Sequence, residues 1–221
     1  LQNLPVLLLI SHSGLAGADG ETHHGVFDHA YLRHMPGMRL LAPSSMERLL
    51  AAVEAGLEAD GPTAICYPRR VLPESLGEAP RDVFTWSMLR TQPGARAALL
   101  AVGHMAGSAL EAARILEEAG FRADVVDAAA IKPLDTRLLD RLLAGKDYLF
   151  TLEDGILQGG FGGAVLEYAA VHGGRARIVP LGYDDRFVGH GTEEQLREEC
   201  GLSPAGIAER ILRAVGRESG R

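Results

Sequence analysis

Cysteine is scarce in this sequence, and long apolar runs and excess positive charge are missing. Cys66 and Cys200 are the only cysteines among 221 residues, which excludes a disulfide framework and leads us to expect a reducing, cytoplasmic environment. No apolar run approaches the roughly 18 residues that a membrane helix needs, so we expect no membrane partner. The formal net charge of −7 argues against nucleic acid as the main partner, because such proteins usually carry a basic patch.

The rest of the composition is ordinary for a globular protein, with 47% hydrophobic and 23% charged residues. Short apolar segments alternate with amphipathic ones along most of the chain. Such alternation predicts an α/β fold with a mostly parallel sheet covered on both faces. We expect two domains, 1–72 and 95–221, joined by a proline-containing linker at 73–94.

The apolar segments predict seven strands and the amphipathic segments predict seven helices. Ser44 or Ser45 is expected to cap the second of these helices, which begins at Met46. Trp86 is expected to anchor the linker to a neighbouring surface. The tail from Gly216 to Arg221 is expected to be mobile. The expected strands are Pro5–Ile10 (as a buried strand), Met38–Leu41, Thr63–Tyr67, Ala97–Val102, Ala123–Asp127, Tyr148–Glu153 and Arg177–Pro180. The expected helices are Val26–His34, Met46–Ala59, Ser108–Ala119, Thr136–Leu143, Phe161–Val171, Thr192–Gly201 and Ser203–Val215.

The segment from Gly14 to Asp28, GLAGADGETHHGVFD, combines glycines, carboxylates and two adjacent histidines directly after an apolar strand. Glycines allow the backbone to approach a ligand closely, and a long polar loop at a strand end is typical of a site. Taken alone, Asp19 and His23 are also compatible with a solvated loop. A zinc site is a weaker alternative, because no recognised ligand spacing is present.

Four ordered motifs resemble the 1-deoxy-D-xylulose-5-phosphate synthase family of the transketolase superfamily, over nearly the whole chain. The GADGxTHxGxFD string separates this family from its relatives. The motifs are the GADGETHHGVFD string within Leu4–Pro43, DGPTAICYPRR at Asp60–Arg70, IKPLD at Ile131–Asp135 and LEDGILQGGFGGAVLE at Leu152–Glu167.

This resemblance implies part of a thiamine-diphosphate pyrimidine-binding domain followed by a transketolase C-terminal α/β domain. It implies an enzyme, a transferase that decarboxylates pyruvate and joins the remaining two-carbon unit to glyceraldehyde 3-phosphate, for isoprenoid, thiamine and pyridoxal biosynthesis. The cofactors implied are thiamine diphosphate and magnesium, both held mainly by residues upstream of Leu1. We therefore expect no cofactor-binding and no metal-binding residue within this chain.

The resemblance also assigns roles to individual residues. His23 and Asp19 match the positions that meet the acceptor aldehyde, where an imidazole can donate a proton near neutral pH and a carboxylate can accept a hydrogen bond. Arg69, in the string Tyr67-Pro68-Arg69, matches the arginine that grips the acceptor phosphate, for which a planar guanidinium is suited.

Two positions depart from the family pattern. His12 stands where the family has a second phosphate-binding arginine, and it is assigned to substrate binding by position. Cys66 and Arg70 flank the Tyr-Pro-Arg string in place of an arginine and a glycine. A neutral histidine lacks the fixed fork of donors that an arginine offers, so these changes weaken the case for a phosphorylated acceptor.

Other polar residues are expected to be structural. His24 is interpreted as a solvated loop residue, Cys66 as a buried small apolar residue, and His104 and His190 as structural by default. The glycines that follow Leu152-Glu153 are expected to serve close packing, because they lack a GxGxxG dinucleotide pattern. The IKPLD string is interpreted as a turn fixed by Pro133.

The chain is expected to be a fragment, a proteolytic product or one subunit of a split enzyme, and to be inactive alone. Its expected partners are the missing N-terminal part and, by the family pattern, a second copy in a homodimer. Two alternatives remain: a split transketolase-like subunit that uses another acceptor, and a non-catalytic partner domain.

Overall fold

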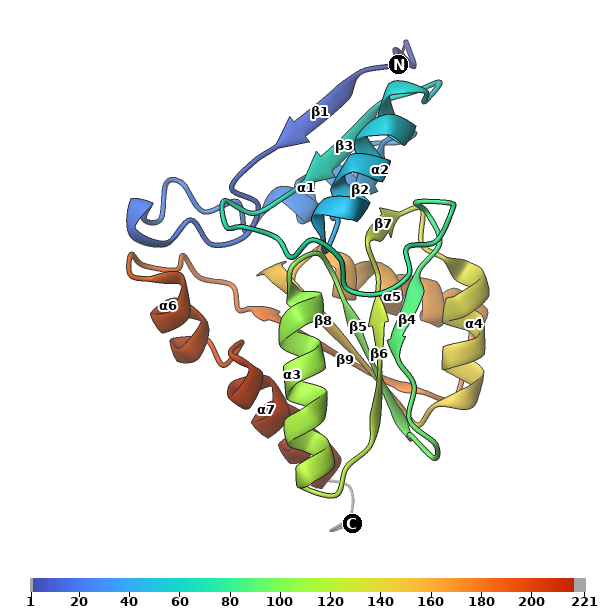
Figure 1. The fold of residues 1–221 in the computed structure, drawn as a ribbon, viewed down its shortest axis with the longest axis vertical. Helices are drawn as coiled ribbons and strands as arrows, with labels where there is room; N and C mark the ends of the chain where they lie inside the picture. Colours follow the sequence, from blue (N-terminus) through green and yellow to red (C-terminus); the bar gives the residue numbers. More distant parts are fainter. Residues whose placement is uncertain (1, 217–221) are drawn as a thin grey trace.

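The computed structural model describes residues 2–216, which form two α/β units stacked along the long axis of the molecule (Figure 1). Each unit has its own sheet. Gly216 ends the last helix, and the remainder of the tail that was predicted to be mobile, 217–221, lies outside the described residues. The strands are β1 (Leu7–Ile10), β2 (Arg39–Leu41), β3 (Thr63–Cys66), β4 (Ser87–Arg90), β5 (Ala97–Ala101), β6 (Ala123–Asp127), β7 (Ala130–Lys132), β8 (Tyr148–Ile156) and β9 (Arg177–Tyr183).

The helices alternate with the strands, as the sequence predicted. None of those within residues 2–216 has both the length and the apolar character required to cross a membrane. They are the 3-10 helix η1 (Gly17–Asp19), α1 (Asp28–Arg33), α2 (Met46–Leu57), α3 (Met105–Glu118), α4 (Thr136–Gly145), α5 (Phe161–His172), α6 (Glu193–Glu199) and α7 (Pro204–Gly216).

The first sheet has the strand order β1-β3-β2-β7. Strands β1, β3 and β2 are parallel, so the loops that follow them leave from the same edge. Strand β7 belongs to the second half of the sequence but pairs antiparallel with β2. The IKPLD string is therefore partly a strand, which precedes the cis peptide bond between Lys132 and Pro133.

Strand β1 lies at the edge of this sheet, which corrects the prediction of a buried strand. It pairs with β3 alone, and Leu8 and Leu9 are 38% and 52% exposed. Burial was predicted because the segment is apolar. Within residues 2–216, no second strand pairs with β1 to cover these side chains.

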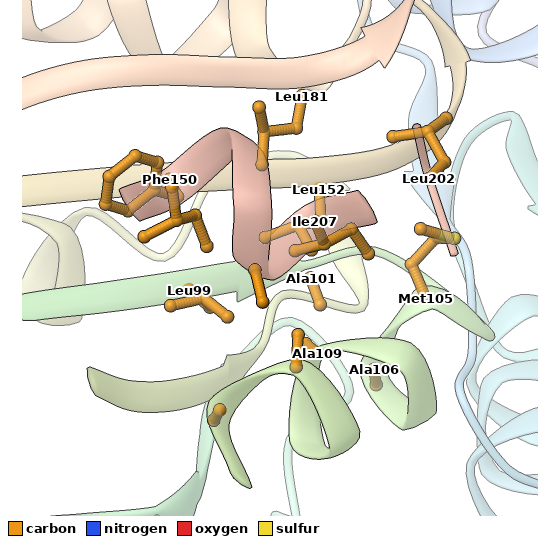
Figure 2. Packing of buried hydrophobic residues seen from close by; sticks show 14 of the residues in the cluster. Leu99, Ala101, Met105, Ala106, Ala109, Phe150, Leu152, Leu181, Leu202 and Ile207 are labelled. Atoms are coloured by element: carbon orange, nitrogen blue, oxygen red, sulfur yellow. The ribbon is translucent and has the colours of Figure 1, made fainter. Parts of the chain in front are cut away.

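The second sheet has the order β4-β6-β5-β8-β9, with β4 antiparallel to four parallel strands. Both sheets are thus mostly parallel, as predicted. The central strand β5 is buried on both faces. Ala97, Leu99 and Ala101 pack with α3 and α7, whereas Ala98 and Leu100 pack in the other cluster with α4 and α5. Figure 2 shows the first cluster, in which small alanines of α3 allow close approach to Ile207 of α7.

The segment 73–94, expected to link two domains, contributes β4 to the second sheet. The sequence did not predict this strand, because Ser87–Arg90 is short and its partner β6 lies far along the chain. Trp86 anchors the segment, as predicted. Its indole is buried, donates a hydrogen bond to the Ala130 carbonyl at 2.8 Å and meets the Phe161 ring edge-on.

A buried polar cluster joins the two units at the start of α2, where Ser44 and Arg48 meet Asp127. Ser45 caps this helix by accepting a hydrogen bond from the Arg48 N–H, while the neighbouring Ser44 hydroxyl donates to Asp127 at the end of β6. The Arg48 guanidinium lies 3.0 Å from the same carboxylate. Burial raises the pKa of Asp127, and Arg48 and Ser44 oppose that rise.

Candidate active site

The loop between β1 and α1 carries most of the residues that the sequence assigned to chemistry. It leaves the carboxyl end of β1 and contains the turn η1, on the left of Figure 1, above α6. Gly14, Gly17 and Gly20 adopt positive φ angles of 89°, 65° and 81°. These conformations are open to glycine at no steric cost, which explains the glycine content of the motif.

Asp154 of β8 holds the start of this loop. Its carboxylate accepts a hydrogen bond from the Leu15 N–H at 3.2 Å. A Cβ atom at Gly14 would overlap the Asp154 side chain, so the loop approaches the strand as closely as glycine permits. The second unit therefore positions the loop of the first.

His24 holds the far end of the loop, which corrects its interpretation as a solvated residue. The side chain is buried. Its Nδ1 atom accepts a hydrogen bond from the Ala16 N–H at 2.9 Å, and its Nε2 atom lies 2.9 Å from the Gly189 carbonyl. Nε2 must then carry the proton and donate it. The His24 ring therefore links two parts of the loop to each other and links the loop to the second unit.

Asp19 and Arg69 form an ion pair that joins two loops at the sheet edge. Asp19 belongs to η1, and Arg69 follows β3. The guanidinium donates to the Asp19 carboxylate, and both side chains are partly exposed. Arg70, next in the chain, lies 4.0 Å from Glu193 of α6.

The side chains of His23 and His12 each lie close to the hydroxyl group of the preceding residue. His23 is exposed, with its Nδ1 atom 3.0 Å from the Thr22 hydroxyl. His12 is partly buried and has a positive φ of 62°, with its Nδ1 atom 3.1 Å from the Ser11 hydroxyl. Of the four predicted site residues, the structure joins Asp19 and Arg69 directly. Of the other two, His23 is exposed on the same loop and His12 is partly buried.

An open groove lies beside η1. Its walls come from the loop and from the second unit, so that His190, a residue missed as a site candidate, lines the same groove as Asp19. The lining residues are Ala18, Asp19, Gly20, Glu21, Thr22 and His190. Nothing in the local sequence around His190 signals this neighbourhood, which arises from the packing of 188–191 against the loop.

Asp154 is itself fixed by three side chains of the second unit. The Tyr183 hydroxyl donates to it, His104 Nε2 lies 2.9 Å away, and Arg197 lies 3.7 Å away. Burial would raise the pKa of Asp154, but the nearby imidazole of His104, with Arg197 and Tyr183, holds that pKa well below its usual range. The loop anchor is therefore an ionised carboxylate. His104, assigned a structural role by default, supports it.

The glycines after β8 serve packing, as predicted. A Cβ atom at Gly162 would lie 2.7 Å from the Thr151 hydroxyl oxygen and 2.8 Å from Pro180 Cβ. The buried Glu153 carboxylate accepts hydrogen bonds from the Phe161 and Gly162 N–H groups at 2.8 and 2.9 Å. These N–H groups at the start of α5 are therefore already bound by the Glu153 side chain.

The carboxylates near the loop do not fit a divalent cation. Within residues 2–216, no three histidine, cysteine, aspartate or glutamate side chains gather as a metal site. Asp19 is engaged by Arg69, and Glu153 by backbone N–H groups. Asp28 accepts a hydrogen bond from Tyr31, and burial raises its pKa. Magnesium would have to compete with each of these partners.

The geometry suits recognition of a polar acceptor molecule. An exposed imidazole can move a proton near neutral pH, and a guanidinium can grip an anion. That guanidinium is held by Asp19, so any anion would have to displace this carboxylate in order to bind it. The glycine-rich loop, held by Asp154 and His24, supplies a fixed frame for these groups.

Comparison with known proteins supports the motif-based resemblance. The family model for the transketolase pyrimidine-binding domain matches residues 1–75, and the model for the transketolase C-terminal domain matches residues 87–207. The 1-deoxy-D-xylulose-5-phosphate synthase of Chlorobium phaeovibrioides is 41% identical over 227 residues, which span 99% of this chain and 35% of that protein. Synthase 1 of Geobacter sulfurreducens is 43% identical over 225 residues, with 98% and 35% covered.

Solved structures agree with these matches. A split-gene transketolase, solved as an inactive β4 tetramer, is 29% identical with a TM-score of 0.85, covering 96% of this chain and 67% of that one. A transketolase mutant from Pichia stipitis shares the fold with a TM-score of 0.81. This chain spans about a third of the length of the curated relatives it matches. It belongs to the transketolase family and contains that family's pyrimidine-binding and C-terminal domains.

Proposed function

We propose that the chain is the C-terminal part of a 1-deoxy-D-xylulose-5-phosphate synthase. The complete enzyme would condense pyruvate with glyceraldehyde 3-phosphate, releasing carbon dioxide. The observation that carries the proposal is the pairing of Asp19 with Arg69, since it brings the GADG and Tyr-Pro-Arg motifs to one edge of the sheet. Identities of 40–43% to synthases over nearly the whole chain support it.

In this proposal His23 donates a proton to the aldehyde oxygen of the acceptor as the new carbon–carbon bond forms. Asp19 accepts a hydrogen bond from an acceptor hydroxyl, and Arg69 binds the acceptor phosphate. His12 adds a further contact to that phosphate when it is protonated. Asp154 and His24 contribute indirectly, because they fix the backbone on which Asp19 and His23 are carried.

We propose that thiamine diphosphate and magnesium are held mainly by residues outside this chain. When bound, the cofactor supplies the electron sink that pyruvate decarboxylation requires. The lack of a fitting carboxylate set within residues 2–216 supports this division. The exposed edge of β1, with Leu8 and Leu9 facing outward, supports a partner surface there for the N-terminal part of the enzyme. Assembly as a homodimer in the cytoplasm completes the proposal.

A split transketolase-like subunit that uses another acceptor is the second candidate. Two observations favour it: His12 and Cys66 stand where two arginines are expected, and the similar solved structure is a split-gene transketolase. A non-catalytic partner domain is a third reading, against which the retention of both Asp19 and His23 speaks.

The test is product formation by the complete assembly, this chain together with its N-terminal part. We expect 1-deoxy-D-xylulose 5-phosphate from pyruvate and glyceraldehyde 3-phosphate, detected by mass spectrometry. Product from an uncharged aldehyde, with none from the phosphorylated one, favours the second candidate. Turnover that is unchanged in His23→Ala contradicts a catalytic role for this residue and favours the third.

A further inference from the structure

Two consecutive arginines follow β3 beside the site loop and reach carboxylates of different units. Arg69 donates to Asp19 of η1, whereas the Arg70 guanidinium lies 4.0 Å from the Glu193 carboxylate of α6. The acceptor site proposed above uses Arg69 alone. Arg70 stands where the family pattern has a glycine, so the resemblance assigns it no role.

The two ion pairs flank the same short turn. Asp19 is the last residue of η1. A Cβ atom added at Gly17, the first residue, would lie 3.5 Å from Glu193 Cγ, so Glu193 packs against the other end of the turn. A 3-10 turn rises about 2 Å per residue, so its three residues span about 6 Å. The carboxylate partners of Arg69 and Arg70 therefore hold both guanidiniums within the reach of one small organic phosphate.

Arg70 is held more loosely than Arg69. Its distance of 4.0 Å from Glu193 is too long for a hydrogen bond, and its side chain is 41% exposed. Glu193 accepts a hydrogen bond at 2.7 Å from Arg197, which is buried on α6. Glu193 therefore keeps a charged partner when Arg70 turns away. An exposed ion pair contributes little to stability, so Arg70 can turn toward an anion at a small cost.

A phosphate monoester needs more positive charge than one guanidinium supplies. Such a group carries about 1.5 to 2 negative charges at pH 7, whereas an arginine contributes one positive charge. His12 and Cys66, the two departures in the neighbouring motifs, supply no permanent charge, because a histidine changes its charge between about pH 5 and 8 and Cys66 is a buried thiol. The second permanent charge beside η1 is that of Arg70.

From this geometry we infer that Arg70 is a second phosphate-binding residue of the acceptor site, and that it determines specificity for a phosphorylated acceptor. The inference rests on the proposed function and deepens it. As the phosphate enters, Arg69 exchanges Asp19 for it, and Asp19 becomes free to accept a hydrogen bond from an acceptor hydroxyl. Arg70 exchanges Glu193 for the same phosphate, and Glu193 stays paired with Arg197.

The binding arm of the test uses glycerol 3-phosphate, a phosphate monoester that lacks an aldehyde and cannot undergo carboligation. It is titrated into the full chain, and its dissociation constant is measured by nuclear magnetic resonance, with glycerol as the uncharged comparison. We expect the parent chain to bind glycerol 3-phosphate more tightly than glycerol, and Arg70→Gln to bind it about tenfold more weakly than the parent. Equal binding of the two compounds by the parent, or an unchanged dissociation constant in folded Arg70→Gln, overturns the inference.

Arg114→Gln is the matched control for net charge. Arg114 is exposed on α3 and forms ion pairs with Glu111 and Glu118, near the end of that helix that points away from β3 (Figure 1). The variant removes the same charge as Arg70→Gln and should leave the dissociation constant unchanged. An equal loss of binding in both variants assigns the effect to net charge and also overturns the inference.

The kinetic arm uses the complete assembly, this chain together with its N-terminal part. Arg70→Gln should raise the KM for glyceraldehyde 3-phosphate about tenfold, with little change in kcat or in the KM for pyruvate. This pattern is expected because Arg70 contacts the phosphate and no reacting atom. With uncharged glyceraldehyde, the parent and the variant should have the same kcat/KM.

The two arms separate this inference from the proposed function. An assembly that forms no 1-deoxy-D-xylulose 5-phosphate contradicts the proposed function, whereas a tenfold loss of glycerol 3-phosphate binding in Arg70→Gln still supports the arginine pair. An assembly that forms the product with the same KM in the parent and in Arg70→Gln overturns the inference and leaves the proposed function standing.

Discussion

The Asp154 carboxylate accepts a hydrogen bond from the Leu15 N–H at 3.2 Å, so that a strand of one unit holds the glycine-rich loop of the other. His24 adds a second link, through the Gly189 carbonyl. These bonds explain how a long, polar loop keeps one shape. They also make the C-terminal domain part of the frame on which Asp19 and His23 are placed.

A methyl group at Gly14 should break this frame. Gly14→Ala places a Cβ atom on Asp154 and imposes a side chain on a residue with a φ of 89°. We expect a loss of about 1–3 kcal/mol in the free energy of unfolding, measured by denaturant titration. The matched control is Gly107→Ala on α3, where a Cβ atom meets nothing within 4 Å. It should be neutral or stabilising by up to about 1 kcal/mol, and equal effects at the two sites would argue against the close approach at Gly14.

The stability of the chain should depend on the ionisation of Asp154. Because its pKa is lower in the folded state than in the unfolded chain, where it is about 3.9, its contribution is fully present above that value. The contribution is lost as the pH falls below about 4 toward the folded pKa. Asp154→Asn should therefore be less stable than the parent at pH 7, with a difference that shrinks on acidification. A difference that stays constant between pH 7 and pH 3 would show that the charge of Asp154 is unimportant.

Substitution of the adjacent histidines, His23 and His24, should affect two different measurements, turnover and stability. His23→Ala removes an exposed ring, so we expect turnover of the complete enzyme to fall about a hundredfold with little change in the melting temperature. His24→Ala removes two buried hydrogen bonds and should lower the free energy of unfolding by about 1–3 kcal/mol. Parallel turnover and melting measurements on both variants provide the check. Loss of stability in His23→Ala, with none in His24→Ala, would reverse the two roles.

Local patterns predicted much of the fold. The alternation of strands and helices, the cap at Ser45 and the packing glycine Gly162 all follow from properties of neighbouring residues. Strands β4 and β7 were missed because each is short and is stabilised by a partner distant in the sequence. Helix α3 begins one turn before the predicted Ser108, because its first residues pack into the core.

The site was predictable only as far as its motifs extend. Asp19 and Arg69 were named from sequence, and the structure pairs them. His24 was misjudged because one histidine in a polar loop carries no sign of burial.

The central claim, that Arg69 binds the phosphate of the acceptor aldehyde, is tested most directly by a cycle of two acceptors and two enzymes. The complete enzyme and its Arg69→Met variant are each assayed with glyceraldehyde 3-phosphate and with glyceraldehyde, and kcat/KM is measured for all four pairs. We predict that the variant reduces the preference for the phosphorylated acceptor about tenfold or more, because a charge-assisted contact of about 1.5–3 kcal/mol is lost. A preference that is the same in both enzymes would contradict the account.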